Sequence, residues 1–332
     1  MVDRIKIKIS KFTVVNDYPL WGNYRPSKFP NRHIFSREIS NEKAKVKRPF
    51  EITLMLYYDD EKDKFTIGFN GSIRKWYFGK NTRRNLTPTQ LKDCIKLLSV
   101  KIGIREQDLL NARVTQLESG VTLLLKSDFK EVINCFARHR TFSREVDGTT
   151  VYFKGKKTKE GKDSIYKYKF YEKYLEINKN DKNFRENPIK MNVHKKFLFF
   201  RFEIVIKKVS GMDFYKTKAK TLNNIIINWE EINLELINRF QAIQFIDLIS
   251  DEKIIDSTKL GKRDSEKYLN FQRIRKNGFL RELEKFELTN TSTNRTTKTK
   301  AFFKNYEMFL DKKIDYKNEL YQALKRKIDS LV

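Results

Sequence analysis

Two stretches, Ile165–Glu176 (IYKYKFYEKYLE) and Phe197–Lys208 (FLFFRFEIVIKK), restrict the fold more than any other part of the chain. Both alternate in character, and successive side chains of a β-strand point to opposite faces of the sheet, so the alternation predicts two strands. In the first strand one face is mainly aromatic and the other mainly basic: Tyr166, Tyr168, Phe170 and Glu172 against Lys167, Lys169, Tyr171 and Lys173.

The second strand divides in the same way into an apolar face and a charged face: Leu198, Phe200, Phe202, Ile204 and Ile206 against Arg201, Glu203 and Lys207. If the two strands share a sheet, Tyr171, Glu203 and several cations meet on one surface. A tyrosine that attacks a phosphodiester needs such a set. The same pattern also fits two amphipathic strands of an ordinary basic protein, with Tyr171 as a surface aromatic.

The charge balance favours a polyanionic partner. The 332 residues include 70 Lys+Arg and 42 Asp+Glu, a formal charge of +28 that is spread along the chain. Nucleic acid suits this charge best. An anionic membrane surface is the competing partner, but no apolar run has the length of a spanning helix, and we expect no membrane association. The apolar content of 39% is that of a globular chain.

Cysteine and histidine are scarce. Cys94 and Cys135 are the only cysteines, which argues against a disulfide framework and favours a cytoplasmic protein. The first residues alternate charged and apolar side chains and contain no signal-peptide core. The cysteines and His33, His139 and His194 nowhere have the spacing of a zinc finger.

The first two thirds of the chain read mainly as strands. Helices are expected from Thr87-Pro88 to about Gly103, where Thr87 caps the first turn, and over Phe129–Ala137. Trp76 and Tyr77 either pack in the core or stack on bases of single-stranded DNA. The remaining expectations are strands at Ile5–Val15, Arg113–Leu125, Thr149–Phe153 and Ser164–Tyr171, a hairpin of Phe50–Tyr58 and Phe65–Phe69, an extended connection at Trp21–Lys47, and a strand or loop at Gly71–Asn81.

After Lys216 the pattern becomes helical. Leu222–Leu248 is long, apolar and periodic, Asp264–Phe286 predicts a second helix interrupted at Gly278, and Thr299–Leu331 carries one or two more. We therefore predict an α+β fold. Residues 1–215 form a central antiparallel sheet with flanking helices, and residues 216–332 form a helical region whose role, DNA binding or dimerisation, stays open.

A third strand offers a second carboxylate. In Arg113–Leu125, Glu118 shares a face with Gly120, and a glycine there would leave room for a ligand. Glu118 and Glu203 are oxygen ligands of the kind that Mg²⁺ or Mn²⁺ prefers. Tyr171, its pKa lowered by nearby lysines, would attack the phosphorus, and Lys173 would contact the phosphate. His139 is either a third ligand or an ordinary histidine.

These residues resemble the rolling-circle replication initiators of filamentous phages and plasmids. In that family a Tyr-x-Lys element precedes an Arg-Phe-Glu strand, matched here by Tyr171-Glu172-Lys173 and Arg201-Phe202-Glu203. Gln116-Leu117-Glu118 corresponds to an upstream strand that usually has arginine at its first position, and GSIRKWYFGKN followed by LTPTQLKDCIKLL is also similar. The resemblance covers residues 50–230. The pair of histidines common in the wider superfamily is missing.

The resemblance implies a metal-dependent nickase that cuts one strand at a phage or plasmid origin. Tyr171 would stay joined to the 5′ phosphate and release a 3′-hydroxyl primer, with a host polymerase and helicase as partners in the bacterial cytoplasm. Tyr171 and Lys173 would be catalytic and Glu118 and Glu203 would hold Mg²⁺ or Mn²⁺. The expected DNA contacts are Lys167, Lys169, Arg201, Lys207, Arg74, Lys75, Lys156 and Lys157.

Two alternatives stay open. In the first, a non-catalytic nucleic-acid-binding protein uses the charge and Tyr171 is incidental. In the second, a relaxase or transposase performs the same tyrosine chemistry. A tyrosine recombinase does not fit, because the chain lacks the Arg…His-x-x-Arg spacing of those enzymes.

Overall fold

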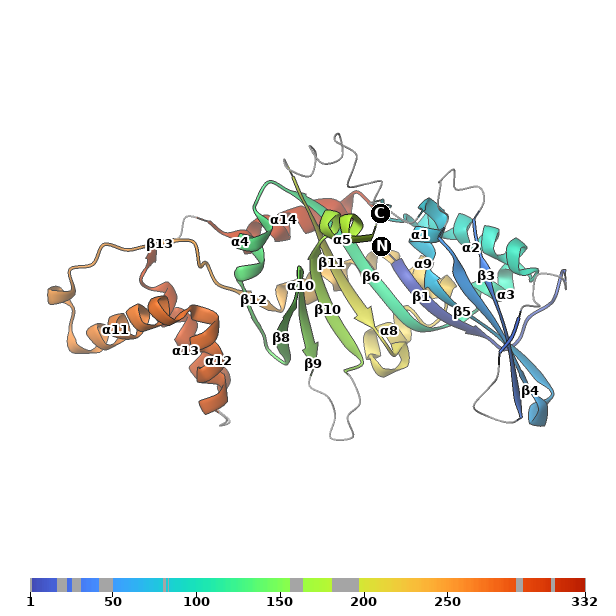
Figure 1. The fold of residues 1–332 in the computed structure, drawn as a ribbon, viewed down its shortest axis with the longest axis horizontal. Helices are drawn as coiled ribbons and strands as arrows, with labels where there is room; N and C mark the ends of the chain where they lie inside the picture. Colours follow the sequence, from blue (N-terminus) through green and yellow to red (C-terminus); the bar gives the residue numbers. More distant parts are fainter. Residues whose placement is uncertain are drawn as a thin grey trace.

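The structure of the protein, a computed structural model, describes residues 2–16, 23–25, 31–41, 50–79, 82, 84–155, 164–180, 197–290, 295–311 and 314–331, without the side chains of 178–180. A ten-stranded antiparallel sheet forms the body of the molecule (Figure 1). In spatial order its strands are β2 (Asn23–Arg25), β3 (Arg32–Ile39), β4 (Ile52–Asp59), β5 (Lys64–Ser72), β1 (Val2–Ile9), β6 (Arg113–Leu125), β11 (Leu198–Ile206), β10 (Tyr166–Glu172), β9 (Thr150–Gly155) and β8 (Phe142–Asp147).

The apolar face of the sheet and several helices share one core. The helices that contribute most are α2 (Pro88–Ile102), α9 (Leu222–Ile227), α10 (Trp229–Gln241) and α14 (Tyr316–Asp329). Leu117, Val121 and Phe202 from the central strands are fully buried among them. Shorter helices border the sheet: α1 (Ile73–Phe78), α3 (Glu106–Leu110), α4 (Phe129–Asn134), α5 (Lys173–Asn180) and α8 (Asp213–Lys218). The α+β class with a large antiparallel sheet is as expected.

A second, smaller core lies in a separate lobe, drawn in orange beyond β8 in Figure 1. It comprises β13 (Asp251–Glu252), α11 (Lys262–Asn277), α12 (Phe279–Thr289), α13 (Arg295–Glu307) and β14 (Leu310–Asp311). Phe271, Phe279 and Tyr306 are among its buried residues. The boundary expected between residues 215 and 216 falls inside α8, and α9, α10 and α14 pack on the sheet rather than in this lobe.

Several local predictions are confirmed. β10 and β11 pair with each other, β4 and β5 form the expected hairpin, and β6 spans the predicted residues. Thr87 and Gln90 form a capping box at the start of α2, and Gly103 ends it with a φ of 83°. The break at Gly278, whose φ is 92°, separates α11 from α12.

Other local predictions are wrong. Trp21–Lys47 is not simply a connection, because β2 and β3 belong to the sheet. Gly71–Asn81, expected as a strand or loop, contains α1. The buried Trp76 indole of α1 donates to the Ile39 carbonyl at 3.0 Å, so of the two alternatives for Trp76 the core position is confirmed. The strand Ile5–Val15 instead begins at Val2 and ends at Ile9.

Two predicted helices end early. Phe129–Ala137 gives way after α4 to β7 (Phe136–His139), which pairs with β12 (Ile243–Phe245). Leu222–Leu248 breaks at Asn228, whose side-chain amide donates to the Asn224 carbonyl at 2.8 Å and so competes with the helical backbone bonds. Within the described residues, none of the helices combines the length and apolarity that crossing a membrane requires.

We predict that Gly120→Ala destabilises the sheet. A Cβ at residue 120 would lie 2.5 Å from the Phe202 carbonyl oxygen and 2.6 Å from Glu203 Cγ. The space expected for a ligand beside Gly120 is therefore filled by Glu203. Overpacking of this kind typically costs about 1–3 kcal/mol, which thermal unfolding measures. Gly261→Ala is the control, because nothing lies within 4 Å of its Cβ and its φ is −62°; an equal loss in both variants would contradict the prediction.

Candidate active site

The polar face of the central strands carries a pocket of about 410 Å³. The pairing of the strands explains its composition. Tyr171 lies opposite Arg201 and Lys169 opposite Glu203 in β10 and β11, while Glu203 faces Gly120 of β6. The structure thus brings together five residues that the sequence singles out: Tyr171, Glu118, Glu203, Lys169 and Lys75.

The Tyr171 hydroxyl is held by a carboxylate. It donates to Glu203 Oε1 at 3.1 Å, and the Arg201 Nε–H donates to the same oxygen at 3.0 Å. Burial, together with the adjacent Glu203 charge, raises the pKa of Tyr171 well above its ordinary value. The expectation that nearby lysines lower this pKa is therefore wrong, since burial and the carboxylate outweigh them. Tyr171 is a neutral hydrogen-bond donor at rest.

Lys169 links the two candidate metal ligands. Its Nζ lies 3.2 Å from Glu203 Oε2 and 3.7 Å from Glu118 Oε1. Burial favours the neutral amine, but the two carboxylates outweigh it and raise the pKa of Lys169. Burial likewise acts to raise the pKa of Glu203, yet Lys169 and Arg201 hold it below its usual value. The pKa of Glu118 is raised, mainly by burial and by the charge of Glu203.

This arrangement bears on the expected Mg²⁺ or Mn²⁺ site. Glu118 and Glu203 are close enough to share one cation, and the Lys169 ammonium takes that position. Both Glu203 oxygens already accept hydrogen bonds, from Arg201 and Tyr171 on one side and from Lys169 on the other. In the part of the chain that the structure describes, no group of three metal-ligating side chains occurs. In this structure the two carboxylates are therefore paired with Lys169, and a metal ion would need its position.

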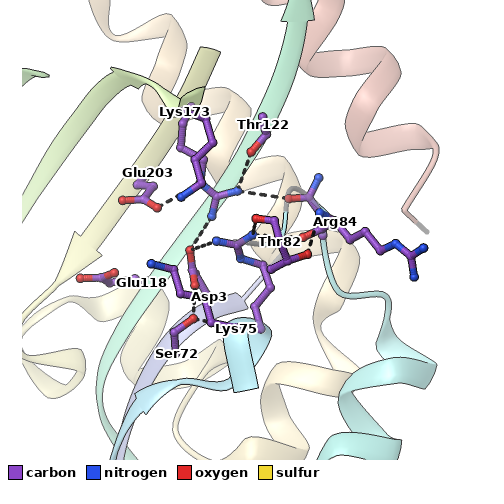
Figure 2. A network of polar contacts seen from close by, with 12 residues as sticks. Asp3, Ser72, Lys75, Thr82, Arg84, Glu118, Thr122, Lys173 and Glu203 are labelled. Atoms are coloured by element: carbon purple, nitrogen blue, oxygen red, sulfur yellow. Dashed lines mark hydrogen bonds and ion pairs between the residues drawn. The ribbon is translucent and has the colours of Figure 1, made fainter. Parts of the chain in front are cut away.

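Arg201 and Arg74, expected to contact DNA, are instead inside the protein. Their side chains are 0% and 1% exposed, and both donate to Asp3 Oδ2, at 2.7 and 2.9 Å (Figure 2). Arg201 also donates to Asn85 and Thr122, at 3.2 and 3.1 Å. Buried in this way, the two guanidinium groups are not available to a phosphate; they position the residues around them.

Asp3 is the central residue that the sequence does not reveal. The pairing of β1 with β6 skips one position between Val2 and Arg4, so Asp3 is the extra residue of a bulge. Bulges re-aim side chains, and here the carboxylate is directed toward Arg74 and Arg201. The Ser72 hydroxyl donates to its other oxygen. Burial acts to raise the pKa of Asp3, but the two arginines hold it well below its usual range.

Lys173 lies behind the pocket rather than in it. It begins α5, whose first turn is capped by Glu172 accepting from the Tyr174 N–H at 3.1 Å. The Lys173 ammonium is 1% exposed, pairs with Glu176 and lies 5.7 Å from the centre of the Tyr171 ring. Burial lowers the pKa of Lys173 to about 8, although Glu176 opposes the shift. Lys173 therefore lies over the Tyr171 ring inside the protein, and the expectation that it contacts a phosphate is wrong, because its side chain is not exposed.

The other candidate residues are more scattered. Lys75 lines the pocket and pairs with Glu176 at 3.6 Å, whereas Lys167 lies over the Tyr152 ring on the same face, and Lys207 is half-buried at the end of β11. His139 packs against Phe142 and Tyr168 at the core, away from Glu118 and Glu203. Lys156, Lys157 and His194 lie outside the described residues.

No protein-family model, curated protein or solved structure matches this chain. The resemblance in Tyr171-Glu172-Lys173 and Arg201-Phe202-Glu203 stays a sequence-level expectation. The observation from which a function can be argued is the contact of Tyr171 with Glu203, set among cations.

We predict that Asp3→Asn destabilises the protein strongly at neutral pH. Removing one partner of a buried ion pair costs about 3–5 kcal/mol. Because the folded-state pKa of Asp3 is depressed, its contribution is fully present above the unfolded-state pKa of about 3.9 and is lost as the pH falls below it. The free energies of unfolding of wild type and variant should converge in acid, as denaturant titrations at several pH values would show.

Asp59→Asn is the matched control. Asp59 pairs with Arg32 and Lys62 at the surface, where salt screens the interaction, so we expect a far smaller change. A neutral-pH loss for Asp3→Asn no larger than for Asp59→Asn would contradict the buried role of Asp3.

Proposed function

We propose that the protein is a DNA-nicking enzyme and strand transferase that uses Tyr171 as its nucleophile, and that it initiates rolling-circle replication at a phage or plasmid origin. The observation that carries the proposal is the hydrogen bond from the Tyr171 hydroxyl to Glu203, whose carboxylate Arg201 and Lys169 hold in place. A nucleophile, a base and a group that orients the base are the parts of an activated hydroxyl. The fold would then be of the rolling-circle nickase type.

The proton and the phosphoryl group balance in one displacement. As the Tyr171 oxygen forms a bond to phosphorus, its proton passes to Glu203 Oε1, at 3.1 Å. The bond from phosphorus to the 3′ oxygen breaks, and that oxygen takes up a proton from solvent water to become a 3′-hydroxyl. The products are a 5′-phosphotyrosine on the protein and a free primer end. Because the pKa of Tyr171 is raised, the proton has to leave during the attack rather than before it.

Cations around Tyr171 suit the charge that develops on the phosphate. Lys169 and Lys75 line the pocket and are 21% and 22% exposed, so a phosphate oxygen can reach both. When a phosphate binds Lys169, the ammonium is drawn away from Glu203, which makes Glu203 a better base. Lys173, below the ring, adds positive charge as the phenol loses its proton. Phosphate binding at Lys169 would therefore favour removal of the Tyr171 proton by Glu203.

The proposal includes a Mg²⁺ or Mn²⁺ ion with Glu118 and Glu203 as its ligands. A bound ion would neutralise charge on the scissile phosphate. It would have to replace the Lys169 ammonium between the two carboxylates. The rest of the proposed setting is origin DNA, a host helicase and polymerase, and the cytoplasm of a bacterial cell.

One observation favours a second function, that of a non-catalytic DNA-binding protein. The Tyr171 hydroxyl is partnered and its pKa is raised, as for a tyrosine that only supports the sheet. In that case the chain binds nucleic acid through its net charge of +28 and forms no covalent bond.

We predict that Tyr171→Phe abolishes covalent attachment to single-stranded origin DNA while DNA affinity stays near that of wild type. The nucleophilic oxygen is lost but the ring still packs. A denaturing gel with end-labelled oligonucleotide measures the adduct. Tyr152→Phe is the matched control, because Tyr152 lies opposite Lys169 on the neighbouring strand of the same face. An adduct that persists in Tyr171→Phe, or its absence in wild type, would refute the assignment.

We also predict that Lys169→Met strengthens Mn²⁺ binding, because the ammonium no longer competes for the two carboxylates. Calorimetry of the free protein measures this without reference to activity, and Glu118→Gln combined with Glu203→Gln should abolish the binding. A chelator should stop adduct formation by wild type. If Mn²⁺ binds neither protein and the chelator has no effect, the metal part of the proposal fails, and Lys169 is the cation that the two carboxylates share.

A further inference from the structure

The lobe formed by α11, α12 and α13 contains a groove of about 650 Å³ between the three helices. Its floor is aromatic. The rings of Phe286 and Phe302 lie 5.0 Å apart at 35°, and Phe302 also lies 5.5 Å from Phe279. Both Phe286 and Phe302 are half-buried, so each presents part of its ring to the groove. A half-buried aromatic ring is what an unstacked base needs as a platform.

The rim of the groove is basic. Lys267, Arg273, Lys285 and Lys298 line it together with one carboxylate, Glu282. Glu282 is shared, since Lys285 Nζ lies 2.8 Å and Arg273 Nε 3.8 Å from it. Lys298 donates instead to the neutral Asn290 side chain at 3.2 Å. Lys267 pairs with Asp264 at 2.7 Å. With four cations against these two carboxylates, the rim keeps an excess of positive charge around the aromatic floor.

Amide side chains complete the lining. Asn270 and Asn305 lie in the groove and offer both hydrogen-bond donors and acceptors, the combination that base edges require. The groove, enclosed by three helices, suits separate bases and not a duplex, whose bases stay stacked inside the helix. A second copy of this chain is a poor occupant, because each copy carries +28.

We propose that this groove binds a short segment of single-stranded DNA, with bases on Phe286 and Phe302 and phosphates at Lys285 and Lys298. The proposal rests on the proposed function only in taking DNA as the partner. Figure 1 shows the lobe apart from the central strands of the sheet, beyond β8. The groove would therefore bind a part of the DNA other than the part at the Tyr171 pocket. In this proposal the role of the helical lobe is to bind single-stranded DNA.

The test compares two double variants of the full chain that remove the same charge. Lys285→Gln with Lys298→Gln alters the groove; Lys262→Gln with Lys276→Gln alters exposed lysines of α11 that do not line it. Fluorescence anisotropy with a labelled oligothymidine of about ten nucleotides measures affinity; OB-fold proteins bind single strands over about 4–16 nucleotides. We expect the groove variant to bind about tenfold more weakly at 0.1 M salt and the control to stay within about twofold.

Salt dependence separates phosphate contacts from stacking. The slope of log affinity against log salt should fall in magnitude by about 1.4 in the groove variant, for two lost contacts at about 0.7 each. Phe302→Leu should weaken binding about fivefold or more without changing the slope. Circular dichroism and thermal unfolding verify that each variant is folded.

Three results would overturn the proposal. They are equal losses in the two double variants, stronger binding of duplex than of the single strand by wild type, or a change of oligomeric state in the groove variant. Repeating the measurements in a Tyr171→Phe background keeps them independent of nicking. If wild type forms no adduct yet the groove variant still loses affinity, the nickase proposal fails and the groove proposal stands; the reverse pattern refutes only the groove.

Discussion

The buried ion pair between Arg201 and Asp3 is the interaction on which the candidate site depends. Both charges are almost completely buried, and a buried charge without a partner would destabilise the folded protein strongly. Once fixed by Asp3, Arg201 has one remaining direction for its Nε–H, toward Glu203. Glu203 in turn accepts from Tyr171. Asp3 of β1 therefore determines the orientation of Tyr171 through Arg201 and Glu203.

The same network balances the charges inside the pocket. Negative and positive groups neutralise each other within the pocket, with Lys169 between Glu118 and Glu203. A phosphate that enters competes with those carboxylates for Lys169, and so it alters the groups that would act on it. Under the proposed function the substrate releases the base from its inhibitory partner, which would limit attack to molecules that place a phosphate at this point.

The strict two-residue period of a strand made part of the site predictable. Lys169, Tyr171 and Glu203 alternate with apolar neighbours, and Glu118 follows the same rule in β6, so the sequence correctly placed them on one face. Burial of Arg201 was not predictable in this way. Its partner Asp3 lies 198 positions away and reaches it through a bulge that shifts the alternation of β1. Hydrophobic patterning contains no information about such a pairing.

Local propensity also has limits that the fold makes clear. Ile73–Phe78 resembles a strand in its aromatic content, yet Ser72 caps it as a helix by accepting the Lys75 N–H. Trp76 then points into the core. By contrast, helix α2 was predictable because its capping box and its terminal glycine are local signals.

The position of β1 in the middle of the sheet affects the order in which the contacts of the candidate site can form during folding. Its two neighbours are β5 and β6, and Arg201 belongs to β11, which the ribosome produces much later. During synthesis Asp3 must wait for a partner nearly two hundred residues downstream. Contacts this distant slow folding, because the loop must close before they form. A nascent or partly folded chain, in which Asp3 and Arg201 are not yet paired, would consequently lack the contacts that orient Glu203 and Tyr171.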